Sequence, residues 1–257
     1  MKPSNYPRAQ LLVERMQGMA KTLEPYEGAL ALLATGSAGL NPEDVDAYSD
    51  LDLLVVTKGA TGAQLLQNLG WLAAVEPIVY RFRYNDDCYK LLFADGVFCE
   101  LSILDASSLQ TLQYSGARII WCRPTFDSST CAPHGPLPQD PQWILDELLT
   151  VVYTGLCKYK RGEQLAAVGY IEGQARELLA RLVTLTQPRA PRVFEDVFAK
   201  ERRFERAYPS LTPLLPAICQ GYDRIPQSAQ AIMNLLESHY SPDPNMTMAI
   251  HRLLSNH

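Results

Sequence analysis

Two patterns of apolar and polar residues follow each other along the chain. Residues 8–23 carry apolar side chains at helical spacing. Between residues 29 and 122, short apolar runs are separated by turns rich in Gly, Asn and Asp, which predicts a series of strands. Strands are expected at 29–35, 51–57, 78–84, 88–93, 97–104 and 117–122. A helix is expected over 61–75, and a short one begins near Ala106.

The second part of the chain has a helical pattern throughout. Residues 123–141 contain five prolines and no periodicity, which is typical of a linker. Long amphipathic stretches follow at 143–160 and 163–185. Shorter helical stretches are expected near 192–207, 210–220, 226–240 and 245–254.

These patterns predict an α+β protein with two domains. We expect residues 1–125 to form a mixed sheet with flanking helices, residues 126–141 a proline-rich linker, and residues 142–257 an all-α helical bundle. A chain of 257 residues is long enough for two modest domains.

Composition and charge narrow the class of protein. Apolar residues make up 47% and charged residues 20% of the chain, which is ordinary for a soluble globular protein. The net charge is −5 and no basic stripe is present, so we expect no nucleic-acid partner. No apolar run approaches the roughly 18 residues that span a bilayer, and the N-terminus lacks an apolar signal segment, so no membrane partner is expected. Six scattered cysteines without a C-x-x-C pair favour free thiols and a cytoplasmic location.

The strongest chemical signal is a Gly-Ser turn followed by two aspartates. Asp50 and Asp52 would project to the same side at the start of a buried strand, because successive strand residues alternate faces. Two carboxylates held this close repel each other, and Mg²⁺ binds through one or two carboxylates together with substrate phosphates. Backbone N–H groups of Gly36 and Ser37, and the Ser37 hydroxyl, would hold phosphate oxygens, and glycine permits the close approach. The motif predicts a Mg²⁺–nucleotide site.

Gly36-Ser37 with Asp50-x-Asp52 resembles the signature of the nucleotidyltransferase fold shared with DNA polymerase β. The sequence is most similar to the aminoglycoside and lincosamide nucleotidyltransferases, and the resemblance covers about the first half of the chain. It implies that the Gly-Ser turn holds the nucleoside triphosphate and that the two aspartates bind metal. It also implies that a later strand supplies a third carboxylate.

Glu100 is the candidate for that third carboxylate. It is a lone charge in the apolar strand 97–104, where a charged side chain is costly unless it is paired or metal-bound. In the enzymes that this chain resembles, the position serves as a metal ligand or as a general base, and both roles stay open. The competing interpretation is an outward-facing glutamate on an ordinary strand. Asp105, at the end of the strand, is the alternative carboxylate.

Two further charged motifs have competing interpretations. Lys158 belongs to a basic cluster between the first two helices of the second half, and it is a candidate contact for the triphosphate. Its competing interpretation is a basic helix C-terminus favoured by the helix dipole. Asp44 and Asp46 form another Asp-x-Asp, but no apolar strand follows it, so we interpret it as a solvated turn.

We therefore expect a Mg²⁺-dependent nucleotidyltransferase that moves a nucleoside monophosphate from an NTP to a hydroxyl of a small molecule and releases pyrophosphate. By resemblance, the acceptor is an aminoglycoside or lincosamide antibiotic and the biological role is antibiotic resistance. Two alternatives stay open: an antitoxin-type enzyme that modifies a protein, and a nucleotide-binding module without turnover. A homodimer is compatible with the sequence.

Overall fold

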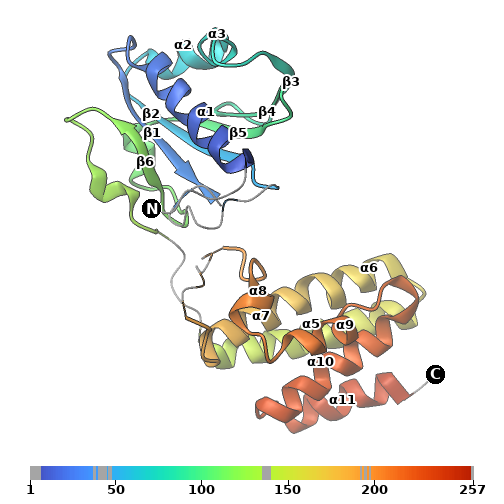
Figure 1. Ribbon diagram of the computed structural model, residues 1–257. Helices are drawn as coiled ribbons and strands as arrows, with labels where there is room; N and C mark the ends of the chain where they lie inside the picture. Colours follow the sequence, from blue (N-terminus) through green and yellow to red (C-terminus); the bar gives the residue numbers. More distant parts are fainter. Residues whose placement is uncertain are drawn as a thin grey trace. The chain divides into compact units, whose positions relative to one another are not determined.

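The computed structural model describes residues 7–36, 39, 45, 48–134, 140–191, 193, 196 and 198–255. The chain forms two compact units, Met1–Pro136 and Leu137–His257. The first unit contains a six-stranded sheet with helices and the second is helical, which confirms the predicted α+β class (Figure 1). Within the described ranges, no helix is both long and apolar enough to cross a lipid bilayer.

The sheet of the first unit is mixed and has the strand order β3-β4-β5-β2-β1-β6. Its strands are β1 (Ala29–Thr35), β2 (Leu51–Thr57), β3 (Ile78–Arg83), β4 (Cys88–Phe93), β5 (Phe98–Asp105) and β6 (Arg118–Cys122). All six strands predicted from the sequence are present, and their ends agree to within one residue. In this sheet β2 and β5 run parallel, whereas the other neighbouring pairs are antiparallel.

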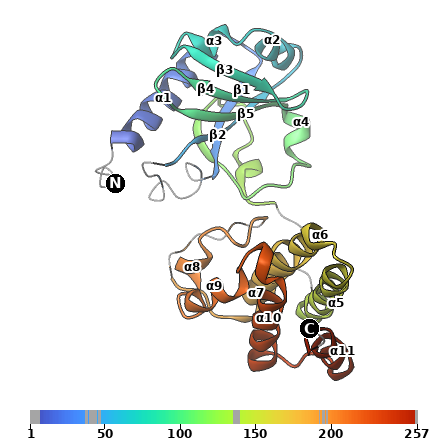
Figure 2. The same ribbon diagram turned by 90° about the vertical axis from the view of Figure 1, so that its right-hand side faces the viewer.

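The two faces of the sheet are covered differently. Helices α1 (Pro7–Leu23), α2 (Thr61–Gln67) and α3 (Gly70–Ala73) pack their apolar side chains on one face, over alternate residues of β1, β2, β4 and β5. On the other face, α4 (Ala106–Leu109) and the 3₁₀ turn η3 (Ser128–Cys131) pack over β1 and β2. Figure 2 shows α1 and α4 on opposite sides of the sheet. Leu104 of β5 packs against this smaller core, whereas side chains of β3 and β4 on the second face lie outside it.

The helix expected over 61–75 is divided in two. Asn68 ends α2 with an extended backbone, and its Oδ1 accepts a hydrogen bond of 2.9 Å from the N–H of Gly70, the first residue of α3. An asparagine side chain can replace a helical hydrogen bond in this way and so terminates the helix locally.

The second unit packs around one apolar core. Its longer helices are α5 (Pro141–Lys160), α7 (Arg176–Thr186), α10 (Ile225–His239) and α11 (Pro244–Ser255). Shorter segments are α6 (Gln164–Val168), the π-helical η4 (Gly169–Ala175), α8 (Phe204–Ala207), η5 (Thr212–Leu214), α9 (Leu215–Ile218) and η6 (Tyr222–Arg224). The stretch predicted at 163–185 is therefore helical with a π-helical middle. The stretches at 192–207 and 210–220 contain only short helices among their described residues.

The predicted linker carries structure at its N-terminal end. Its residues up to His134 belong to the first unit, where η3 packs on the sheet and Tyr114 and His134 form an isolated β-bridge. Residues 135–139 lie outside the described residues. The boundary between the two units falls among them.

A buried arginine connects the helical layer to two turns of the first unit. Arg15 of α1 is 5% exposed, and its Nη2 pairs with Glu76 at 3.4 Å and with Asp95. The guanidinium also lies 4.7 Å from the centre of the Phe93 ring, a cation–π contact. Glu76 follows α3 and Asp95 lies between β4 and β5, so one cation holds three separate segments together.

We predict that Arg15→Met lowers the free energy of unfolding of the first unit by about 3 kcal/mol, because two partly buried carboxylates lose their counterion. Urea denaturation followed by tryptophan fluorescence measures the change. Lys21→Met is the matched control, since Lys21 is an exposed cation of the same helix and should cost less than about 0.5 kcal/mol. Equal effects of the two substitutions would show that the Arg15 network does not stabilise the fold.

Candidate active site

Strand register places the predicted carboxylates in one row across the sheet. Asp52 of β2 lies directly opposite Glu100 of β5, and Glu100 lies opposite Lys90 of β4. The row continues to Phe82 of β3 on one side and to Thr35 of β1 on the other. Side chains that lie opposite each other on neighbouring strands point to the same face. Asp52 and Glu100 therefore share the face that the small core only partly covers, with their strands about 4.8 Å apart.

Gly36 lies directly against the Asp52 carboxylate. It follows β1 with a φ of +60°, and a Cβ built on it would overlap Asp52 Oδ2 and lie 2.9 Å from Asp52 Cγ. The preceding Thr35 donates a hydrogen bond of 3.2 Å from its Oγ1 to the backbone oxygen of Asp52. Glycine is thus required at this position for two reasons, the backbone conformation and the space that the carboxylate fills. Ser37, predicted to bind phosphate with Gly36, lies outside the described residues, as do Asp44 and Asp46.

Asp50 stands immediately before β2 and is partly exposed, like Asp52. The two carboxylates act on a common neighbour, the buried Cys99 of β5. Burial raises the pKa of the Cys99 thiol, and the charges of Asp52 and Asp50 raise it further. The thiol therefore stays protonated and is neither a nucleophile nor a metal ligand at neutral pH. Both aspartates lie at the start of β2.

Glu100 forms an ion pair that the sequence analysis missed. Its Oε1 lies 2.8 Å from Lys90 Nζ, and both side chains are partly exposed. The hydrogen bond to Glu100 raises the pKa of the Lys90 ammonium. Lys90 is also a lone charge in an apolar strand, so the reasoning that singled out Glu100 could have found it as well.

The three predicted metal ligands are not gathered into one cluster. Among the described residues, no group of three His, Cys, Asp or Glu side chains could hold a metal ion. Asp50 and Asp52 stand two residues apart at the start of β2, and Glu100 pairs with Lys90. This donor set fits a Mg²⁺ that takes two carboxylates from the protein and its other ligands from substrate phosphates.

Asp105, the alternative third carboxylate, has a structural role instead. It lies opposite Thr57, at the far end of the β2–β5 pair from Asp52 and Glu100. Its Oδ1 accepts hydrogen bonds from the hydroxyl and the backbone N–H of Ser107, which lower the pKa of the carboxyl. Asp105 is thus the N-cap of α4 and is not part of the site.

Lys158 lies in the last turn of α5, in the second unit. Its Nζ forms an ion pair of 2.7 Å with Glu163 Oε2. This arrangement agrees with the basic helix C-terminus considered as the competing interpretation. A contact between Lys158 and a nucleotide stays a prediction.

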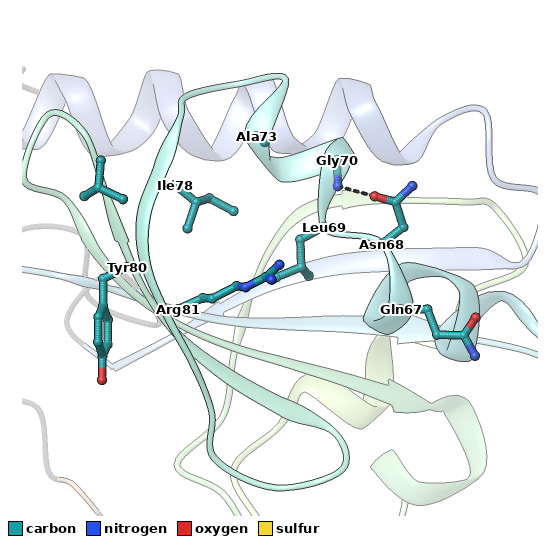
Figure 3. A pocket seen from close by; sticks show the side chains of 9 residues that line it. Gln67, Asn68, Leu69, Gly70, Ala73, Ile78, Tyr80 and Arg81 are labelled. Atoms are coloured by element: carbon teal, nitrogen blue, oxygen red, sulfur yellow. Dashed lines mark hydrogen bonds between the residues drawn. The ribbon is translucent and has the colours of Figure 1, made fainter.

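A pocket of about 390 Å³ lies elsewhere on the first unit, between β3 and the α2–α3 segment (Figure 3). Arg81 extends from β3 toward Leu69 and Asn68 in this view. Arg81 lies opposite Leu91, whose side chain belongs to the core under α1, α2 and α3. The pocket is therefore on the other face from Asp52 and Glu100 and is separate from the carboxylate row.

Comparison with known proteins gives matches among solved structures only. No protein-family model matches the sequence, and no curated protein matches it either. A nucleotidyltransferase-like protein from Exiguobacterium sibiricum is 15% identical with a TM-score of 0.36, over 95% of this chain and 74% of the other. An aminoglycoside 6-adenyltransferase from Bacillus subtilis is 13% identical with a TM-score of 0.34, over 95% and 91% of the two chains.

A third similar structure is a spectinomycin adenyltransferase from Enterococcus faecialis, with ATP and spectinomycin. It is 12% identical with a TM-score of 0.35, over 96% of this chain and 97% of the other. All three proteins are nucleotidyltransferases or nucleotidyltransferase-like by name, the family that the sequence resembles.

Two glycines of similar backbone conformation test the contact with Asp52. We predict that Gly59→Ala costs about 1 kcal/mol of stability, because Gly59 has a φ of +62° but open space around its Cβ position. Gly36→Ala has the same backbone strain and also displaces Asp52, so its loss should be clearly larger. Urea denaturation of both variants measures the difference. Equal losses would show that Gly36 does not pack against the carboxylate in solution.

Proposed function

We propose that the protein is a Mg²⁺-dependent nucleotidyltransferase that transfers a nucleoside monophosphate from an NTP to a hydroxyl of a small molecule. The observation that carries the proposal is the arrangement of Gly36, Asp52 and Glu100. A glycine turn lies against one carboxylate, and a second carboxylate lies opposite the first on a neighbouring parallel strand. This arrangement can hold a metal–triphosphate beside a group that accepts a proton.

Each residue has a proposed role in the transfer. Asp50 and Asp52 would hold Mg²⁺, which neutralises the charge that develops on the triphosphate. Backbone N–H groups at Gly36 and Ser37 would bind phosphate oxygens. The acceptor oxygen forms a bond to the α-phosphorus, the bond from that phosphorus to pyrophosphate breaks, and the hydroxyl proton passes to a Glu100 oxygen. Lys90 orients Glu100 through their ion pair.

The proposed acceptor, location and biological role rest on the resemblance of the Gly36-Ser37 and Asp50-x-Asp52 motif to the antibiotic nucleotidyltransferases. An aminoglycoside or lincosamide antibiotic is the proposed acceptor, with a cytoplasmic location and a role in antibiotic resistance. Lys158 is a proposed contact of the nucleotide, from the second unit. We propose that the protein binds neither nucleic acid nor membranes. We also propose that it forms a homodimer.

Pyrophosphate release is the first measurement. The protein is incubated with Mg²⁺, each of the four common NTPs and a panel of aminoglycosides and lincosamides. We predict release that depends on one acceptor class and falls by about 100-fold or more in Asp50→Asn and Asp52→Asn, since each loses a charged metal ligand. Asp105→Asn is the matched control, because asparagine also caps helices and Asp105 is outside the site.

Turnover within severalfold of wild type in either aspartate variant would contradict the assignment. Two alternatives give different results in the same samples. Nucleotide binding without pyrophosphate release would indicate a binding module. A mass shift on a co-purifying protein, with no reaction on small molecules, would indicate the antitoxin-type activity.

A further inference from the structure

The pocket between β3 and the α2–α3 segment contains a positive charge that the fold does not use (Figure 3). Arg81 is the one charged side chain among the described residues that line this pocket of about 390 Å³. Its guanidinium forms no hydrogen bond or ion pair with any residue that the structure describes. An arginine presents five N–H donors, so this side chain is available to a ligand. We refer to this cavity as the Arg81 pocket.

The second arginine of β3 has partners of its own. Arg83 donates hydrogen bonds to the backbone oxygens of Asn85 at 3.3 Å and of Asp86 at 2.9 Å, and it lies 3.9 Å from the Asp86 carboxylate. Its guanidinium also lies 5.9 Å from the centre of the Tyr89 ring. Arg83 therefore stabilises the turn between β3 and β4, whereas Arg81 has no such structural role.

A β-bulge in β3 determines which side chains reach the Arg81 pocket. Ile78 lies opposite Phe93. Arg81 lies opposite Leu91, and both of these partners belong to the core under α1, α2 and α3. In a regular strand, residues three apart project to opposite faces. The register shift between Ile78 and Tyr80 inserts one residue, so an apolar side chain and a guanidinium lie on the same face.

The opposite wall of the pocket carries no charge. Residues 60–75, which include α2 and α3, contain no Asp, Glu, Lys, Arg or His. Glu76 follows them, and its carboxylate already pairs with Arg15 at 3.4 Å. Gln67 and Asn68 line the pocket with amide groups, which add neutral hydrogen-bond donors. The potential in the pocket is therefore set mainly by one cation, and it favours an anion.

We propose that the Arg81 pocket binds a small organic carboxylate with one or two rings. A guanidinium pairs with a carboxylate through two parallel hydrogen bonds. One cation balances the single charge of a carboxylate, whereas a phosphate monoester carries about −1.5 to −2 at neutral pH. Leu69, Ile78 and Val79 line the pocket with apolar side chains that would cover the rings. Ligand pockets span roughly 300–1,000 Å³, so the volume of this one suits a compact ligand.

This binding site is separate from the carboxylate row and does not rest on the proposed function. Arg81 lies on the face of the sheet that α1, α2 and α3 cover, whereas Asp52 and Glu100 lie on the other face. A molecule in the Arg81 pocket is therefore neither the NTP nor the acceptor of the proposed transfer. Its recognition is a further binding function of the first unit, and measuring it requires no turnover.

Nuclear magnetic resonance of the full chain, labelled with nitrogen-15, measures this binding. The probe is indole-3-acetate, and indole-3-acetamide is the matched ligand, because it keeps the rings and lacks the charge. We expect the acetate to shift the backbone amide signal of Gly70 and the side-chain amide signals of Asn68, both in the pocket. It should bind about tenfold more tightly than the acetamide, since hydrogen bonds to charged groups are the stronger ones.

Two substitutions of arginine by glutamine test the role of the charge. Arg81→Gln should weaken binding of indole-3-acetate by about tenfold and leave binding of indole-3-acetamide unchanged. Arg83→Gln is the matched control, because it removes the same charge from the same face of the strand and should change the affinity by less than about twofold. Arg81 is exposed, so its substitution should leave the melting temperature unchanged.

Four results would each overturn the proposal. Equal affinity of wild type for the two ligands would show that the charge is not recognised. Equal losses in Arg81→Gln and Arg83→Gln would assign the binding to the general charge of β3. Absence of shifts at Gly70 and Asn68 with millimolar indole-3-acetate would show that the pocket does not bind it. Inorganic phosphate that binds through Arg81 more tightly than indole-3-acetate would show that the ligand class is wrong.

Discussion

The parallel pairing of β2 with β5 is the constraint on which the candidate site depends. It sets Asp52 beside Glu100, two residues that are far apart in the sequence, and it sets both at the same end of neighbouring strands. An antiparallel pairing would bring the start of β2 to the end of β5, where Asp105 is the N-cap of α4. The direction of one strand pair therefore decides which carboxylates meet.

Charge at this end of the sheet falls into two groups. Asp50 and Asp52 both raise the pKa of the Cys99 thiol, and Glu100 pairs with Lys90. Gly36 completes the first group, since its missing side chain makes room for the Asp52 carboxylate. The division suits a site in which two carboxylates hold a cation and the third one, kept apart from them, handles a proton.

The sequence predicted the strands of the first unit well because each is a short apolar run between strong turn signals. It also singled out Asp50 and Asp52 as candidates by the Gly-Ser turn before an Asp-x-Asp motif, and Glu100 as a lone charge in an apolar strand; their place in a site stays a prediction. It missed Lys90, although the Asp95-Gly96 turn that predicts the β4–β5 hairpin also brings Lys90 opposite Glu100. It could not predict the break at Asn68 or the role of Asp105, because both depend on local hydrogen bonds of one side chain.

The path of the chain between β2 and β5 has a consequence for folding. The segment that joins β2 to β5 contains α2, α3, β3 and β4, so the pairing of β5 with β2 closes a long loop. Closing so long a loop is entropically costly and tends to occur late. Asp52 and Glu100 would then meet later than the local β4–β5 hairpin forms. A nascent or partly unfolded chain would therefore possess the glycine turn and both aspartates without Glu100 beside them, so the row of carboxylates would be complete only when the sheet is.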